Sequence, residues 1–129
     1  MINLEIKAET LRENLKEIEV ALGEVDTKLQ FKVMLVCEEI LTNQIRHADF
    51  ENLSPEMTLS IEILSEEKVK LIFKDNAMEF NLLNHPDPDV NAEIDDRKLG
   101  GLGIFLSKKY AKELTHSYDE GRNILRVTL

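Results

Sequence analysis

The sequence has few of the residues that build disulfides, membrane spans or basic surfaces. It contains one cysteine and no tryptophan among 129 residues, so no disulfide can form within the chain. That residue, Cys37, stands in an apolar helical pattern, which favours a buried structural thiol over a nucleophile. No apolar run approaches the roughly 20 residues of a membrane-spanning helix. The opening MINLEIKAETL lacks the basic and then apolar plan of a secretory signal, and we therefore expect a cytoplasmic protein with no membrane partner.

Acidic residues outnumber basic ones, 25 against 16, and the formal net charge is −9. Nucleic acid and anionic membranes carry charge of the same sign, which argues against either as the main partner. An acidic surface of this kind suits contact with a basic partner protein. The length and a hydrophobic content of 43% predict one globular domain over residues 1–129, with a single core.

Apolar periodicity predicts the order strand, helix, helix, strand, strand, lid, helix, strand, strand. Turns are expected at SEEK, residues 65–68, and at DEGRN, residues 119–123. The pattern predicts strands over residues 2–7, 57–63, 69–73 and 125–129. It predicts helices over residues 9–22, over about 27–48 and from the glycine cluster to about 114. This mixture predicts an α+β two-layer sandwich, with helices on one face of a mixed sheet.

Two adjacent segments near the third helix break this regularity. Residues 81–99 hold two prolines and little periodicity, and an irregular stretch of that length inside a compact domain is typical of a functional loop or lid. GGLGIFL follows at once and places Gly100, Gly101 and Gly103 at the start of a helix. Glycine is costly there. It indicates either a tight entry where no side chain fits or bare amides that bind a phosphate.

The second predicted helix carries two stripes. The apolar stripe consists of Met34, Cys37, Leu41, Ile45 and Ala48. Glu39, Asn43 and His47 lie four residues apart on another stripe, so their side chains share one small volume. A carboxylate there suits a general base, and a carboxamide oxygen suits a hard cation. The alternative is a solvated polar face, which the nearby apolar Val36 and Ile40 disfavour.

Three segments in order resemble a known family: EEILTNQIRHA at 38–48, FKDNAMEF at 73–80 and GGLGIFL at 100–106. They are similar to the ATP-binding domain of the GHKL superfamily, and within it to the small serine/threonine kinases that act as bacterial anti-sigma factors. The likeness covers roughly residues 5–129. It implies a Bergerat-type ATP-binding fold with a mixed, mainly antiparallel sheet covered on one face by about three helices.

The resemblance assigns roles to the first two motifs. It implies that Glu39 is the general base, that Asn43 binds Mg²⁺ and that His47 lines the ATP pocket. Asp75 matches the acid that accepts a hydrogen bond from the adenine amino group, and Phe80 ends the same motif in the nucleotide-binding region. An acidic acceptor reads an exocyclic amine, because a carbonyl at that position would leave the carboxylate unpaired. Asp75 taken alone is equally well explained as a turn residue at a strand end.

The glycine motif would bring backbone amides to the triphosphate. The resemblance implies that the amides from Gly101 to Gly103 approach the phosphates, with Gly100 before them and a helix that starts near Leu102. Arg97 and Lys98 precede the motif and either supply positive charge to the phosphates or are solvated lid residues.

The chain departs from the family pattern close to Asp75: where the family usually has glycine two residues after the adenine-reading aspartate, this chain has Ala77. Glycine lets backbone approach the base or take a positive φ, so the alanine methyl is either absorbed or weakens nucleotide binding.

Two functions follow as hypotheses from the resemblance. The first is a Mg-ATP-dependent kinase that phosphorylates a small anti-anti-sigma partner with a STAS domain, with a sigma factor as a second partner and with homodimerisation. The second is a nucleotide-binding module that sequesters its partner without phosphoryl transfer, which Ala77 favours. A histidine kinase fragment is disfavoured, because no dimerising helical hairpin precedes the first strand.

Overall fold

The computed structural model describes residues 1–84 and 99–129 of the chain. Five strands run over Ile2–Ile6 (β1), Met57–Ser65 (β2), Lys68–Asp75 (β3), Glu113–Asp119 (β4) and Arg122–Thr128 (β5). The helices are Leu11–Ala21 (α1), Thr27–His47 (α2) and Leu99–Tyr110 (α3), with short 3₁₀ turns at Ala8–Thr10 (η1) and Leu82–Asn84 (η2). The predicted order of strands and helices is confirmed.

The strands form one sheet in the order β1-β2-β3-β5-β4, and all four pairs are antiparallel. A two-layer α+β sandwich was predicted and is present. The prediction of a mixed sheet needs one correction, since no parallel pair occurs among the described strands. For two of the pairs the physical reason is that short turns join β2 to β3 and β4 to β5, and such turns permit only antiparallel pairing.

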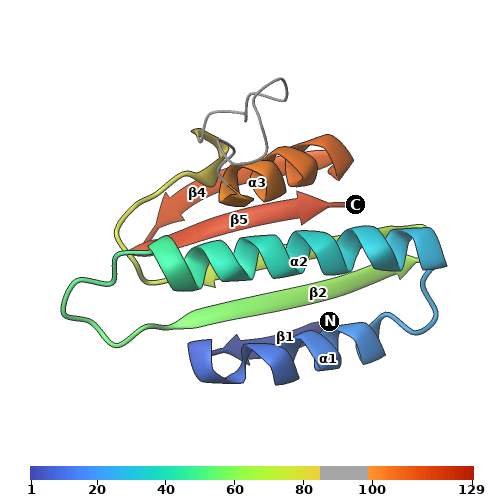
Figure 1. Cartoon of the computed structure of the whole chain (residues 1–129), viewed down its shortest axis with the longest axis horizontal. Coiled ribbons are helices and arrows are strands. Elements are labelled where there is room, and N and C mark those ends of the chain that lie inside the picture. The colour runs from blue at the N-terminus through green and yellow to red at the C-terminus, as the bar shows by residue number, and fades with distance from the viewer. Residues whose placement is uncertain (85–98) are drawn as a thin grey trace.

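The three helices α1, α2 and α3 lie together over one face of the sheet (Figure 1). The core fills the space between the two layers, and its largest fully buried side chains include Phe73 of β3, Ile18 of α1 and Leu41 of α2. Each such side chain contributes roughly 1.5–3 kcal/mol of transfer free energy when it leaves water. Burial of these side chains stabilises the packing of α2 against the middle of the sheet.

Helix α2 begins where the sequence predicts. Asp26 is its N-cap, and its Oδ2 accepts hydrogen bonds from the backbone N–H groups of Lys28 at 3.1 Å and Leu29 at 3.3 Å. Arg46 and His47 lie in the last turn, where positive charge suits the helix dipole. Of the predicted apolar stripe, Cys37 and Leu41 are buried, whereas Met34, Ile45 and Ala48 are half-buried. The buried residues of α2 are Leu29, Val33, Val36, Cys37, Ile40, Leu41, Asn43 and Gln44.

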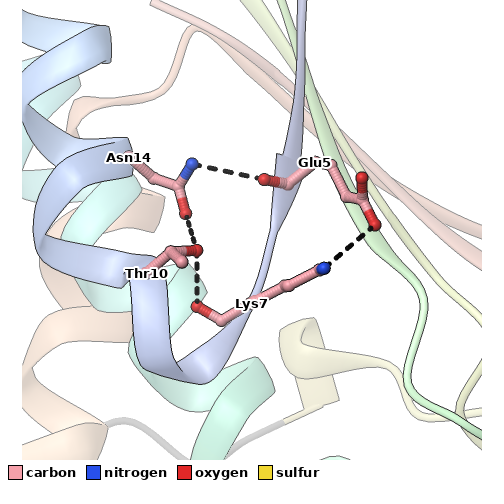
Figure 2. A network of polar contacts seen from close by, with 4 residues as sticks. All are labelled: Glu5, Lys7, Thr10 and Asn14. Carbon is pink, nitrogen blue, oxygen red and sulfur yellow. Dashed lines mark hydrogen bonds and ion pairs between the residues drawn. The ribbon is translucent and has the colours of Figure 1, made fainter.

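A small polar network fixes the junction between β1 and α1 (Figure 2). Asn14 is buried, and its Nδ2 donates to the backbone carbonyl of Glu5 at 3.2 Å, while its Oδ1 accepts from the Thr10 hydroxyl at 2.9 Å. Lys7 and Glu5 form a long ion pair at 4.0 Å on the exposed side. The network holds the first helix beside the edge strand and adds polar contacts to the apolar packing of Ile6 and Ile18 in the core.

The β4–β5 hairpin confirms the predicted turn at residues 119–123. Glu120 and Gly121 connect the strands with φ of 51° and 74°, as a two-residue hairpin loop with left-handed backbone requires. The predicted helix end near 114 is wrong: α3 ends at Tyr110, and β4 begins at Glu113. The alternation of Leu114 and His116 with outward residues is a strand pattern, and the hydrogen bond from the Lys112 N–H to the Thr128 carbonyl draws the chain into the sheet.

Cys37 is fully buried in the core, as its apolar neighbours predict. Removal from water disfavours a thiolate and raises the pKa of the Cys37 thiol well above its usual range. Within the described ranges, the structure contains no helix with both the length and the apolar character needed to cross a membrane.

The predicted lid at residues 81–99 is described only at its two ends. Leu82–Asn84 forms η2, and Leu99 is the first residue of α3. Residues 85–98 lie outside the described part of the chain, and Arg97 and Lys98 are among them.

Candidate functional site

A small hollow lies between the last turns of α2 and the inner face of the sheet, where β3 ends and β5 begins. Its volume is about 30 Å³, enough for one or two water molecules. The polar residues that line it are Asn43, Gln44, His47, Asp75, His116 and Asn123. The apolar lining consists of Ala48, Phe73, Ala77, Phe80, Leu82 and Leu125. An apolar hollow with several convergent polar groups has the composition of a ligand site.

Asp75 is the last residue of β3 and is only 6% exposed. Its Oδ1 accepts hydrogen bonds from the Asn123 amide at 2.9 Å and from the Ala77 N–H at 3.0 Å. Its Oδ2 accepts one from Gln44 Nε2 at 3.0 Å. A carboxylate offers about four acceptor positions, so three are filled and one remains on Oδ2. The hydrogen bond to Ala77 is an Asx turn, and the predicted turn role of Asp75 is therefore present together with its buried position.

Asn123 stands directly across from Asp75 in the β3–β5 register. Its Nδ2 donates to Asp75 Oδ1 and to the backbone carbonyl of Met78, each at 2.9 Å. Its Oδ1 accepts from the N–H of Phe80 at 2.9 Å and lies 3.0 Å from His116 Nε2. Because an amide oxygen only accepts, His116 carries its proton on Nε2. Asn123 thus attaches the segment after β3 to the sheet.

Asn43 and Glu39 lie one turn apart on α2. Asn43 is 7% exposed, and its Nδ2 donates to the Glu39 backbone carbonyl at 2.7 Å. Its Oδ1 makes no hydrogen bond with any residue in the described part of the chain, so an acceptor oxygen is available to a ligand. The donor set fits a hard cation that takes one protein oxygen and completes its shell with other oxygens.

Glu39 is half-buried and does not line the hollow. Desolvation by burial raises the pKa of its carboxyl, the neighbouring Glu38 raises it further, and Arg46 lowers it. A raised pKa makes a carboxylate a stronger base than an ordinary glutamate side chain. Glu39 is therefore accessible from solvent and has a raised proton affinity.

The structure brings five of the residues singled out from the sequence to one hollow. They come from the end of α2, the end of β3 and the segment that follows it, namely Asn43, His47, Asp75, Ala77 and Phe80. Arg97 and Lys98 fall outside the described residues. Groups of three or more His, Cys, Asp or Glu residues that could hold a metal do not occur in the described ranges.

The glycine segment lies inside α3. The helix begins at Leu99 and not near Leu102, so Gly100 and Gly101 are in its first turn and Gly103 is one turn further along. The N–H groups of a first turn have no acceptor within the helix, whereas that of Gly103 meets one in regular geometry. The next residue, Ile104, is buried beside Ile40, Leu82 and Leu125. Leu82 and Leu125 also line the hollow, so α3 packs next to it.

Ala77 occupies the position where the family usually has glycine. Among the described non-glycine residues a positive φ occurs at Glu51 and Glu120 and not at Ala77. Alanine therefore fits this backbone without strain. Its methyl group is 3% exposed and takes up space in the lining of the hollow.

Three polar lining residues were not anticipated from the sequence: Gln44, His116 and Asn123. Two of them carried a signal. Gln44 continues the apolar spacing of Cys37 and Leu41, and Asn123 precedes Leu125 in the inward alternation of β5. A polar residue at an inward position is the feature to look for, because it must find a partner in the core.

Residues 3–129 match the family described as the histidine kinase-like ATPase domain. The chain is also similar to two proteins named serine-protein kinase RsbW, from Listeria monocytogenes and Listeria innocua, each 26% identical over 95 residues. These alignments cover 70% of this chain and 60% of each relative. The chain thus matches about three fifths of the length of these curated relatives.

Proposed function

Because the chain belongs to the histidine kinase-like ATPase domain family, we propose that it is an anti-sigma regulatory kinase that transfers phosphate from Mg-ATP to a small partner protein. The acceptor is a serine or threonine on an anti-anti-sigma protein with a STAS domain, and a sigma factor is the second partner. The active form is a homodimer in the cytoplasm. The observation that carries the proposal is the convergence of Asn43 and Asp75, from separate motifs, on one hollow beside α3.

The adenine base and the phosphates of ATP occupy different parts of this site. The remaining acceptor position on Asp75 Oδ2 takes a hydrogen bond from the adenine amino group, with His47 and Phe80 at the wall. The first-turn amides of Gly100 and Gly101 face the phosphates, followed by Leu102 and Gly103, and helix N-termini favour such anions. Arg97 and Lys98 add positive charge to the same phosphates.

Phosphoryl transfer then depends mainly on position and charge. Glu39 accepts the proton of the attacking hydroxyl group, and its raised pKa suits that role. Asn43 Oδ1 holds Mg²⁺, which when bound neutralises charge on the phosphate oxygens. Because Asn43 Nδ2 donates a hydrogen bond to the Glu39 carbonyl, the Oδ1 of Asn43 is turned away from α2.

The hollow must widen to admit a purine, since about 30 Å³ is far below the roughly 300 Å³ of the smallest usual ligand pockets. The Phe80 side chain has room to move outward, because it is 51% exposed and the residue is held through its backbone by Asn123. An outward rotation of the Phe80 and Leu82 side chains opens the site without breaking the hydrogen bonds of Asp75.

Two measurements on the wild-type chain test the proposal. Calorimetry with ATP and Mg²⁺ should give saturable binding, and radiolabelled ATP with a STAS-domain partner should give a phosphorylated partner with label on serine or threonine. A chain that binds no ATP at any Mg²⁺ concentration contradicts the proposal as a whole. Binding without transfer to any partner supports the second function, a sequestering module.

The second function has its own observation in the structure. The Ala77 methyl occupies the lining of a hollow that is already small, which reduces the space for the base. If the chain acts as a sequestering module, ATP binding orders the partner-binding surface, and the partner is captured or released without phosphoryl transfer.

We expect Ala77→Gly to bind ATP several-fold more tightly than the wild type. Loss of the methyl group enlarges the hollow, while the added freedom of glycine in the unfolded chain lowers the free energy of unfolding by about 0.5–1 kcal/mol. Calorimetry and urea unfolding measure the two effects. Ala21→Gly removes a methyl group at the end of α1, away from the hollow, and serves as the control. Unchanged affinity in Ala77→Gly would mean that the methyl does not restrict the base.

A further inference from the structure

Gln44 carries the one buried side-chain nitrogen or oxygen atom that lacks a hydrogen-bond partner in the described part of the chain, its Oε1. The residue is 7% exposed and lies on the last turns of α2, within the lining of the hollow. Buried acceptors are nearly always paired, so an unpaired one in the lining of the hollow indicates a group that arrives from outside.

The orientation of the Gln44 amide follows from its neighbour. Its Nε2 donates to Asp75 Oδ2 at 3.0 Å. The reversed amide would bring two acceptor oxygens together, which is unfavourable. Oε1 is therefore the atom directed away from Asp75, and Gln44 cannot satisfy it by turning over.

Two oxygen atoms at this point of the site have unfilled acceptor positions. One remains on Asp75 Oδ2 after its hydrogen bond from Gln44, and Gln44 Oε1 is entirely open. An exocyclic amine carries two N–H donors on one nitrogen. A carbonyl at the same place on the base would oppose both acceptors at once.

We propose that Gln44 is a specificity-determining residue, whose Oε1 is a second acceptor, beside Asp75, for the amine of a 6-aminopurine. The inference rests on the proposed function, since it concerns the base-binding end of the same nucleotide site. Adenine is then selected by two residues on different elements, Gln44 of α2 and Asp75 of β3. Gln44 also positions the carboxylate of Asp75 through its Nε2.

The test compares two nucleotides that differ only at this amine. Calorimetry on the full chain measures the dissociation constants of ATP and of purine riboside triphosphate, which lacks the amine. Their ratio is the readout, because effects on the phosphates or on global stability cancel in it. The wild type should prefer ATP by about a hundredfold, which two hydrogen bonds, one of them to a carboxylate, can supply.

Two variants isolate Gln44. Gln44→Met has a similar volume and loses both polar atoms, and Gln44→Lys keeps an N–H donor for Asp75 but has no acceptor. Both should reduce the preference for ATP by about tenfold, while purine riboside triphosphate binds nearly as in the wild type. Thermal unfolding identifies a variant that does not fold, and the other then carries the test.

The outcomes separate the two proposals. A wild type that binds neither triphosphate overturns the proposed function and this inference with it. A wild type that binds ATP, with variants that weaken both triphosphates by the same factor, overturns the role of Gln44 alone. Equal affinity of the wild type for the two triphosphates also overturns the inference and leaves ATP binding intact.

Discussion

Replacement of Glu39 by glutamine should lower the rate of phosphoryl transfer by roughly a hundred- to ten-thousandfold, the range that a positioned general base contributes. ATP affinity should stay within about twofold, because Glu39 does not line the hollow. Single-turnover transfer of label to the partner protein and calorimetry with ATP measure the two quantities. A separation of this kind between binding and transfer is the mark of a residue that acts on the chemical step.

Glu39→Gln should also leave the free energy of unfolding unchanged or raise it at neutral pH. The pKa of Glu39 is raised in the fold, so the folded state holds this proton more tightly than the unfolded state. Stability therefore falls as pH rises through the interval between the unfolded and folded pKa, and it is regained below that interval. Urea unfolding at acidic and neutral pH should show the gain from glutamine only at neutral pH.

Glu38→Gln is the matched control for Glu39→Gln. Glu38 is the adjacent residue on α2 and is exposed, so the same charge is removed from a side chain that faces solvent. Its maximal transfer rate should be that of the wild type. The acid limb of its pH–rate profile should move to lower pH, because Glu38 is one cause of the raised pKa of Glu39. Equal transfer rates in both variants would remove Glu39 from the chemical step.

Asp75→Asn should weaken ATP binding by roughly 10- to 150-fold, the loss expected for a hydrogen bond to a charged acceptor. The same change should lower the free energy of unfolding by about 1–3 kcal/mol. Three protein N–H groups donate to the Asp75 carboxylate, and an amide in its place has one oxygen and an NH₂ group that opposes one of these donors. Calorimetry and urea unfolding measure the two losses.

Asp119→Asn provides the comparison for Asp75→Asn. Asp119 is exposed at the end of β4, so the substitution removes one negative charge without touching the hollow. It should leave both ATP affinity and stability within experimental error of the wild type. If Asp75→Asn loses stability but binds ATP normally, the carboxylate is a structural residue of the β3–β5 junction and does not read the base.

The elements of this fold could be predicted because their signals are local. Asp26 begins α2 by capping it, and the alternation of Met57, Leu59 and Ile61 defines β2. The end of the third helix was predicted four residues late. Nothing at Ala111 or Lys112 prevents a helix; a tertiary hydrogen bond from Lys112 to Thr128 ends it. Such a bond is not visible in a local pattern.

The site was predictable for residues whose motifs mark a helix face or a strand end, such as Asn43 and Asp75. The partners of Asp75 were not predicted, because they depend on which strand lies beside β3. Asn123 reaches Asp75 across 48 positions of sequence through the β3–β5 register, and Gln44 reaches it from α2 across 31. Antiparallel β3–β5 pairing determines that contact, and a turn motif alone does not predict it.

The burial of Cys37 makes the chain a suitable background for site-directed labelling. The only thiol of the sequence is shielded from reagents and held in its unreactive protonated form. A cysteine introduced at Met78, a surface position beside the hollow that is 49% exposed, would therefore react alone with a maleimide fluorophore. Fluorescence from that single dye could follow nucleotide entry without first removing the native sulfhydryl group.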